Sequence, residues 1–130
     1  EGVTKFMNIL AVDYGTKNIG LAWAQIGLGV VLPYGVIKDK NLDELVKLIK
    51  KENIDKVIIG LPFGLKEKEN ENTKKIRKFA DDLKKIINIP IEFEDERFSS
   101  QAADRMEGGG ASRDEKSAMI ILQGYLAKIK

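Results

Sequence analysis

A chain of 130 residues that is 43% hydrophobic and 32% charged is long enough for one domain with a substantial core. It has no cysteine, which excludes disulfides and thiolate metal sites, and no histidine, which excludes imidazole as catalytic base or zinc ligand. Any metal must therefore bind oxygen ligands, which favours magnesium, manganese or calcium, while the net charge of +2 identifies no partner.

The organisation expected from the sequence is a single domain over residues 7–130. Residues 1–6 precede Met7, where the strand pattern begins, and are expected to be an expression remnant or a disordered N-terminus. No apolar run approaches the roughly 20 residues of a membrane span, and no secretory leader is visible. We therefore expect a cytoplasmic protein without a membrane partner.

The first half of the chain predicts three strands in a meander, then a helix and a fourth strand. Pro33 and Gly35 favour an edge or bulged position for the third strand, and Trp23 is expected in the core. Asn41, with Glu44 three residues on, predicts the start of the helix. The expected strands are residues 9–12, 19–24, 30–37 and 56–60, and the helix is residues 42–51.

The second half predicts a polar loop over 64–72, a helix over 73–87, a strand over 91–94 and a final helix over 113–129. A short helix beginning at Ser99 or Ser100 and a glycine break at 108–110 lie between the last two. Strands alternating with helices predict a mixed sheet, parallel in its second half, with helices on its faces. The inner stripe of the 73–87 helix is expected to be Ile76, Phe79, Ala80, Leu83, Ile86 and Ile87.

Asp13 ends the first apolar strand and opens a glycine-containing turn. An acid at the rim of a core is partly desolvated, so its charge needs a cation or several donors nearby. Alternatively, Asp13 caps the turn through its own backbone. A second acidic position, Asp95 with Glu96, follows the last strand. Ligands gather at the carboxyl ends of such strands, so these acids would share an edge if the first and last strands are parallel neighbours.

Asp114 lies in the first turn of the final helix, because Ser112 and Glu115 form a capping box. It is within about 40° of the centre of the helix's apolar stripe and should face the sheet. Glu115 is expected to turn further away and to serve the cap. The alternative is that Asp114 merely favours the helix N-terminus electrostatically.

Carboxylates brought within a few ångströms repel one another unless divalent cations bind between them. Two magnesium ions held in this way can activate water and stabilise the leaving oxygen of a phosphodiester. That chemistry requires no histidine.

Four segments, in this order, resemble the signature blocks of the YqgF/RuvX family. They are VDYGTKNIGLA (12–22), VIIGLP (57–62), DERFSSQAA (95–103) and D-x-x-S-A-x-x-I-L-Q-x-Y-L (114–126). The resemblance implies an RNase H-like fold, related to the RuvC resolvases, with a mixed five-stranded sheet flanked by helices. It implies a metal-dependent nuclease that matures the 5′ end of pre-16S ribosomal RNA; the alternative is a Holliday-junction resolvase acting on branched DNA.

The resemblance also assigns roles to residues. Asp13, Glu96 and Asp114 would be the catalytic carboxylates and bind Mg²⁺ or Mn²⁺. Neighbouring strand residues point to opposite faces, so only one of Asp95 and Glu96 can point at the metals. Glu96 is preferred because RuvC-like enzymes usually have glutamate there, and Asp95 is the alternative. Thr16, Lys17 and Arg97 would contact nucleic acid.

Two departures from the family pattern affect substrate contacts. Asn18 stands where the family usually has arginine, and residues 63–70 lack its asparagine and glycine turn. The expected partners are nucleic acid and the assembling small ribosomal subunit, bound by a monomer or homodimer. The densest basic cluster is Lys74, Lys75, Arg77 and Lys78.

Two other functions remain open from the sequence. The Asp13-Tyr14-Gly15-Thr16 turn also resembles the phosphate loop of actin-like ATPases, but those enzymes need two lobes and only one fits in this length. The other is a nucleic-acid-binding module without catalysis.

Overall fold

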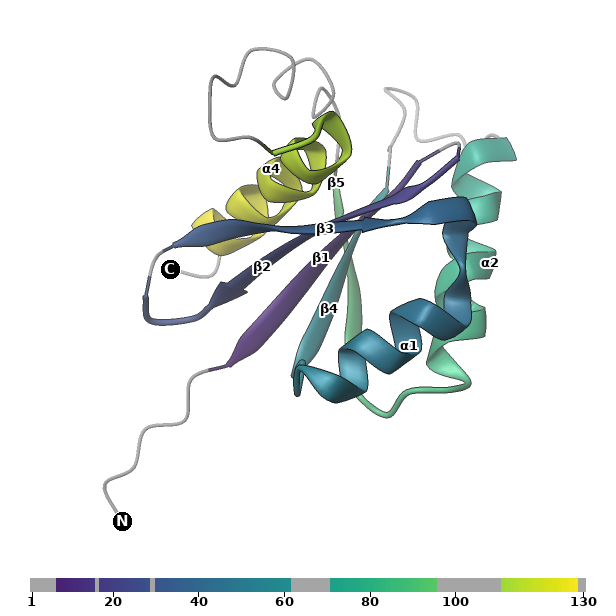
Figure 1. The fold of residues 1–130 in the computed structure, drawn as a ribbon, viewed down its shortest axis with the longest axis horizontal. Coiled ribbons are helices and arrows are strands. Elements are labelled where there is room, and N and C mark those ends of the chain that lie inside the picture. The colour runs from purple at the N-terminus through teal and green to yellow at the C-terminus, as the bar shows by residue number, and fades with distance from the viewer. Residues whose placement is uncertain (1–6, 16, 29, 62–70, 96–110, 129–130) are drawn as a thin grey trace.

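A five-stranded mixed sheet forms the centre of the molecule (Figure 1). The computed structural model describes residues 7–15, 17–28, 30–61, 71–95 and 111–128. The strand order is β3-β2-β1-β4-β5, with β1, β2 and β3 antiparallel and with β4 and β5 parallel to β1. This confirms the predicted mixed sheet. The strands are β1 (Asn8–Tyr14), β2 (Ile19–Gln25), β3 (Val31–Ile37), β4 (Lys56–Leu61) and β5 (Ile91–Asp95).

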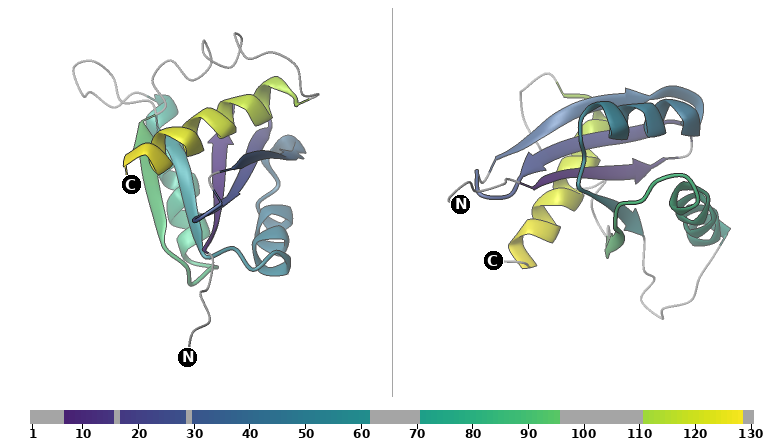
Figure 2. Two further views of the ribbon diagram at one scale, coloured as in Figure 1. Left: turned by 90° about the vertical axis from the view of Figure 1, so that its left-hand side faces the viewer. Right: turned by 90° about the horizontal axis from the view of Figure 1, so that it is seen from below.

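Helices cover both faces of this sheet, with α1 and α2 on one face and α4 on the other (Figure 2). The helix α1 has the predicted bounds, and the Asn41 side chain caps it by accepting from the Glu44 amide at 3.1 Å. The edge position of β3 and the irregular β2–β3 register are also as expected. The helical segments are η1 (Lys38–Lys40), α1 (Leu42–Lys51), α2 (Glu71–Lys84) and α4 (Arg113–Lys128).

The predicted bounds of α2 need correction. The helix begins at Glu71 and ends at Lys84, earlier than expected at both ends. The Ile86 and Ile87 amides both donate to the Leu83 carbonyl, so the chain tightens there and the helical stripe no longer applies. Ile87 is buried as predicted, but Ile86 is 43% exposed and is not part of the inner stripe.

The two faces of the sheet have different cores. The α1 and α2 face buries large side chains, including Leu10, Ile59 and Leu83, and Trp23 packs against them as predicted. The α4 face contains alanines from β1, β2 and α4. Small side chains let a helix lie close to a sheet, and α4 packs mainly against β1, β2 and β3.

The condition under which the first and last strands would bring their acids together, that they are parallel neighbours, is met only in part. They run parallel, but β4 lies between them, so their carboxyl ends are not direct neighbours. The predicted short helix after Ser99 and the glycine break lie outside the described residues. Within the described residues, no helix is long and apolar enough to cross a membrane.

Candidate active site at the carboxyl end of β1

Asp13 lies near the carboxyl end of β1, on the face that α4 covers. It pairs across the antiparallel ladder with Gly20 of β2. Its neighbours Val12 and Tyr14 pack against the α1 and α2 core, while Ala11 belongs to the α4 core. Alternation along the strand therefore directs the half-buried Asp13 side chain toward α4.

Gly20 brings the first turn of α4 against the strand beside Asp13. A Cβ atom at Gly20 would lie 2.9 Å from the Asp114 Cβ and closer still to the Asp114 carbonyl group. Only glycine leaves room for this approach, which places the backbone of Asp114 on the strand position paired with Asp13. The two acids, distant in sequence, therefore lie on one face and at one edge of the sheet. The role of Gly20 was missed from the sequence, although a glycine inside a strand commonly marks a close backbone approach.

Glu115 fixes the orientation of this first turn. It forms the predicted capping box: its Oε1 accepts from the Ser112 amide at 2.9 Å, and the Ser112 hydroxyl accepts from the Glu115 amide at 3.2 Å. Its Oε2 also accepts from the Gly35 amide of β3 at 2.6 Å. Glu115 thus serves the cap as predicted, and its second contact, with the sheet, is one that the sequence did not predict. The irregular backbone of β3, where Gly35 has a φ of 110°, leaves that amide available to a side chain.

The far half of α4 is fastened to the sheet by one ion pair, from Lys128, and by one hydrogen bond, to Tyr125. Lys128 Nζ lies 3.0 Å from Glu94 Oε2, and Glu94 is only 6% exposed. Lys56 Nζ lies 2.7 Å from Glu92 Oε2 and donates to the Tyr125 hydroxyl at 2.9 Å. The hydrogen bonds to Glu92 and Tyr125 raise the pKa of the Lys56 ammonium above its ordinary value of 10.5. These contacts, together with the cap, hold α4 at both ends.

Asp95 lies on the other face of the sheet from Asp13. It pairs with Leu61, which belongs to the α1 and α2 core, and Phe93 packs against the same core. Glu94, between Phe93 and Asp95, faces α4 instead. The contact of Glu94 with α4 was missed from the sequence. Glu96 and Arg97 lie outside the described residues.

The described acids alone do not complete a metal site. No group of three or more acids gathers within the ranges that the structure describes. Asp13 and Asp114 do supply two carboxylates from separate elements at one edge, and carboxylate oxygens are the ligands that magnesium and manganese prefer. The chemistry of these two donors therefore fits such an ion.

Among the predicted nucleic-acid contacts, Lys17 is exposed in the turn between β1 and β2, and Thr16 lies outside the described residues. Asn18 has a structural role in the same turn. Its carbonyl accepts from the Gly15 amide at 3.0 Å, and its side chain accepts from the Asp39 amide of η1 at 3.1 Å. It therefore ties the turn that follows Asp13 to the segment that follows β3.

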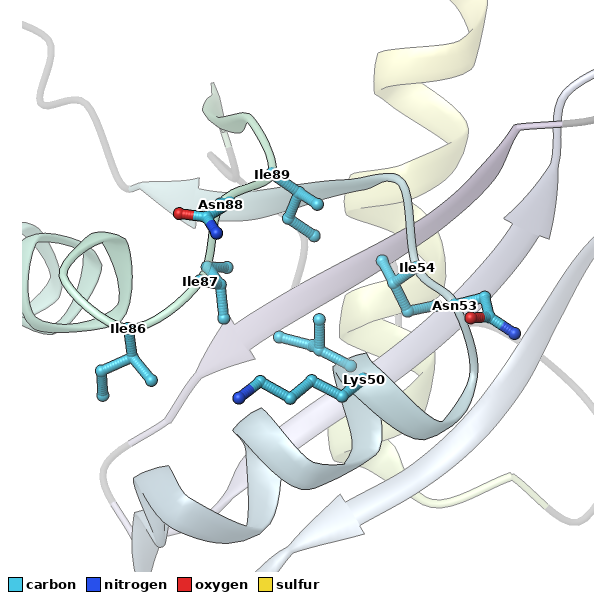
Figure 3. A pocket seen from close by; sticks show the side chains of 8 residues that line it. Lys50, Asn53, Ile54, Ile86, Ile87, Asn88 and Ile89 are labelled. Atoms are coloured by element: carbon cyan, nitrogen blue, oxygen red, sulfur yellow. The ribbon is translucent and has the colours of Figure 1, made fainter.

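An apolar hollow of about 340 Å³ lies at the opposite end of the sheet, between the end of α1 and the segment that leads into β5 (Figure 3). Isoleucines dominate its lining, and no acid belongs to the described part of that lining. This hollow is therefore not a site for the metal chemistry considered above. Its lining residues are Ile49, Lys50, Asn53, Ile54, Ile86, Ile87, Asn88 and Ile89.

Comparison with known proteins identifies relatives over nearly the whole chain. The family model described as "RuvX: Holliday junction resolvase" matches residues 7–128. A protein of Dictyoglomus turgidum, named "Putative pre-16S rRNA nuclease", is 42% identical over 92% of this chain and 94% of its own length. A protein of the same name from Maridesulfovibrio salexigens is 34% identical over 94% of this chain and 99% of its own.

Solved structures show the same fold. The RuvC protein of Thermus thermophilus, in complex with a Holliday junction substrate, matches with a TM-score of 0.62 and 12% identity. The match covers 95% of this chain and 96% of that one. The fowlpox virus resolvase, in complex with Holliday junction DNA, matches with a TM-score of 0.57 and 14% identity over 95% and 99% of the two chains. The expected RNase H-like fold is confirmed.

Proposed function

The chain belongs to the RuvX family, and from this we propose that it is a metal-dependent endonuclease that hydrolyses phosphodiester bonds in the 5′ leader of pre-16S ribosomal RNA. The names of relatives at 42% and 34% identity support this substrate. The observation that carries the chemistry is the contact of Gly20 with the Asp114 backbone, which sets two acids at one edge of the sheet. Such RNA would be met in the cytoplasm, on the assembling small ribosomal subunit.

We assign the metal ligands to Asp13, Asp114 and Glu96. Asp95 is the less suitable member of its pair, because its side chain lies on the face opposite Asp13. Bound Mg²⁺ or Mn²⁺ would supply an activated water and stabilise the leaving oxygen. Asp13 and Asp114 would hold their carboxylates in place without large motion, because a strand ladder and a capped, ion-paired helix carry them.

The residues around these acids would hold the substrate. Lys17 stands exposed in the turn that follows Asp13, so its ammonium can contact a phosphate at this edge. Thr16 and Arg97 are further candidates from the family pattern. Phosphate contacts position a strand and do not read its sequence, so folded RNA structure would select the cleavage site.

The second candidate is a resolvase of four-way DNA junctions. The description of the matching family model favours it. The two substrates can be separated by incubating the purified protein with a precursor RNA leader and with a four-way DNA junction, each in magnesium, manganese or excess chelator. We expect metal-dependent cleavage of the RNA. Cleavage of the junction alone would establish the alternative, and binding without cleavage of either would establish a non-catalytic module.

Asp114→Asn is the matching test of the site. We expect it to abolish cleavage, because it removes a ligand charge without changing size. Asp43→Asn is the control, since Asp43 is an exposed acid in the first turn of another helix, α1. Equal activity in the Asp114 and Asp43 variants would contradict the assignment.

A further inference from the structure

A second hollow, of about 250 Å³, lies between η1, the start of α1 and the middle of α2. It opens on the face opposite α4, at the carboxyl end of β1. Three ammonium groups and one acid contribute to its lining, so its described charges are predominantly positive. We call it the lysine pocket; its lining includes Tyr14, Lys40, Lys75, Lys78, Phe79 and Asp82.

An aromatic pair supports one wall of this pocket. The ring centroids of Tyr14 and Phe79 are 4.6 Å apart, and Lys40 Nζ lies 4.2 Å from the Tyr14 centroid. A cation over an aromatic face is attracted to the ring, so Tyr14 holds the Lys40 ammonium at the pocket. Lys40 belongs to η1, which Asn18 ties to the turn after β1. The position of this charge is therefore coupled to the strand that carries Asp13.

The other two ammonium groups come from α2. Lys75 and Lys78 are three positions apart, which places them on one side of the helix, and both are exposed. Lys78 Nζ lies 3.4 Å from Asp82 Oδ2, with the lysine side chain 75% exposed. An exposed pair of this length holds its partners weakly. Lys78 can therefore exchange Asp82 for a phosphate at little cost.

The position of the pocket connects it to the acids. Asp13 and Tyr14 are consecutive residues of β1, so their Cα atoms are about 3.8 Å apart while their side chains point to opposite faces. Phosphates of one nucleic-acid strand recur about every 3.4 Å along a helix axis. A strand with its scissile phosphate at Asp13 would thus reach the lysine pocket within a few nucleotides.

We propose that the lysine pocket binds the backbone phosphates of the substrate strand that flank the scissile bond, with Tyr14 positioning Lys40 for this contact. This inference rests on the proposed nuclease function, which places the scissile phosphate of the substrate strand at Asp13. It adds a second binding face, so that the strand would bend around the end of β1 and leave the α4 face.

The test measures binding and not cleavage. In the Asp13→Asn background, Lys75→Gln/Lys78→Gln is compared with Lys84→Gln/Lys85→Gln. The second variant removes the same charge from exposed positions at and just after the far end of α2. Fluorescence anisotropy with a labelled single-stranded RNA gives the Kd over a range of salt concentrations. The binding constant K falls as salt rises, so the slope of log K against log salt is negative. We expect the pocket variant to reduce the magnitude of this slope by about 1.4, or about 0.7 for each lost contact, and the control to leave it unchanged.

Two further comparisons locate the contact. Shortening the RNA at one end should remove the difference in Kd between the pocket variant and the parent with both lysines, because the flanking phosphates are then missing. Tyr14→Phe keeps the ring and should bind like the parent, whereas Tyr14→Leu should bind several-fold more weakly. Thermal unfolding of each variant checks that the fold is kept.

Equal losses in the pocket and control variants, or no loss in either, would overturn the proposal. These outcomes do not depend on cleavage. A pocket-specific loss of binding, found together with no cleavage by the protein that keeps Asp13, would retain the pocket and reject the nuclease. Cleavage by that protein, with identical salt slopes for the pocket and control variants, would retain the nuclease and reject the pocket.

Discussion

The two faces of the sheet differ in how they are packed and in what the packing does. The face under α1 and α2 buries large aliphatic side chains, and two helices cover it. The face under α4 is lined partly with alanines, and one helix lies close enough that Gly20 touches the Asp114 backbone. Large side chains fill volume and supply most of the burial free energy. Close backbone approach instead fixes the relative position of two acids. Substitutions on the two faces should therefore separate activity from stability.

The largest effect is expected from Asp13→Asn. It should lower the cleavage rate by at least the roughly 10²–10³-fold seen when one electrostatic stabiliser is removed from an active site. The fold should be nearly unaffected, because the change conserves size on a half-buried strand residue. Cleavage rates and thermal unfolding measured on the same sample check both statements. If the Asp13→Asn variant were destabilised but kept its specific activity, the roles assigned to the two faces would be wrong.

Leu83→Ala tests the opposite face. Leu83 is fully buried in α2, so the substitution should cost about 2–5 kcal/mol of unfolding free energy through lost burial and a residual cavity. The cleavage rate per folded molecule should stay within about twofold. Urea unfolding gives the stability, and rates at low temperature, where the variant is folded, give the activity. A large loss of rate there would show that the two faces are coupled.

Gly20→Ala should affect both properties. The added methyl group collides with the Asp114 backbone, so the first turn of α4 must shift. A displacement of this kind costs on the order of 10²-fold in rate, and the strain costs about 1–3 kcal/mol. Gly124→Ala is the control, because a Cβ there meets only the end of the Glu94 side chain, at 3.3 Å. If Gly124→Ala lowered the rate as much as Gly20→Ala, the close approach would not be the cause.

Ser112→Ala removes one half of the capping box. The expected cost is about 1 kcal/mol of stability, since the Glu115 amide loses its acceptor. The rate should fall less than in Gly20→Ala, because Glu115 still accepts from Gly35. Thermal unfolding and cleavage assays measure the two effects.

The smallest effect concerns the pH dependence of stability. The pKa of Lys56 is raised in the folded protein, so its contribution is complete below pH 10.5 and is lost as the pH rises through the higher folded value. Lys56→Met should therefore differ from the parent in unfolding midpoint at neutral pH and converge with it at strongly alkaline pH. A constant difference across that range would contradict the assignment.

The sequence was sufficient to predict elements whose signals are local. Both ends of α1 were predicted correctly, because Asn41 marks the start of the helix and the apolar stripe stops where the helix ends. The α2 stripe was misleading, because Ile86 continues the period after the hydrogen bonding has tightened at Leu83. Periodicity records which residues are apolar, and it does not record where the backbone leaves the helix.

The site was predictable only in part, for the same reason. Asp13 and Asp114 were proposed from their positions at the ends of elements, and the structure places them on one face of the sheet. The contacts that hold them were not, because they join residues from separate elements. Gly20 meets α4, Glu115 reaches Gly35, and Glu94 pairs with Lys128. Each depends on how α4 crosses the sheet, and no pattern within a single element carries that information.

The helix α4 follows all five strands of the sheet in the sequence, and this order has a consequence for biosynthesis. Translation at about 5–20 residues per second needs roughly 2–7 s to extend the chain from the end of β5 to the end of α4. Throughout that interval one face of the nascent sheet, including Ile9, Ala11 and Ile58, lacks its cover. The growing chain therefore passes through a stage that exposes apolar surface and invites chaperone binding. Asp114 reaches its position beside Gly20 only when that stage ends, so the two acids come together in the last step of folding.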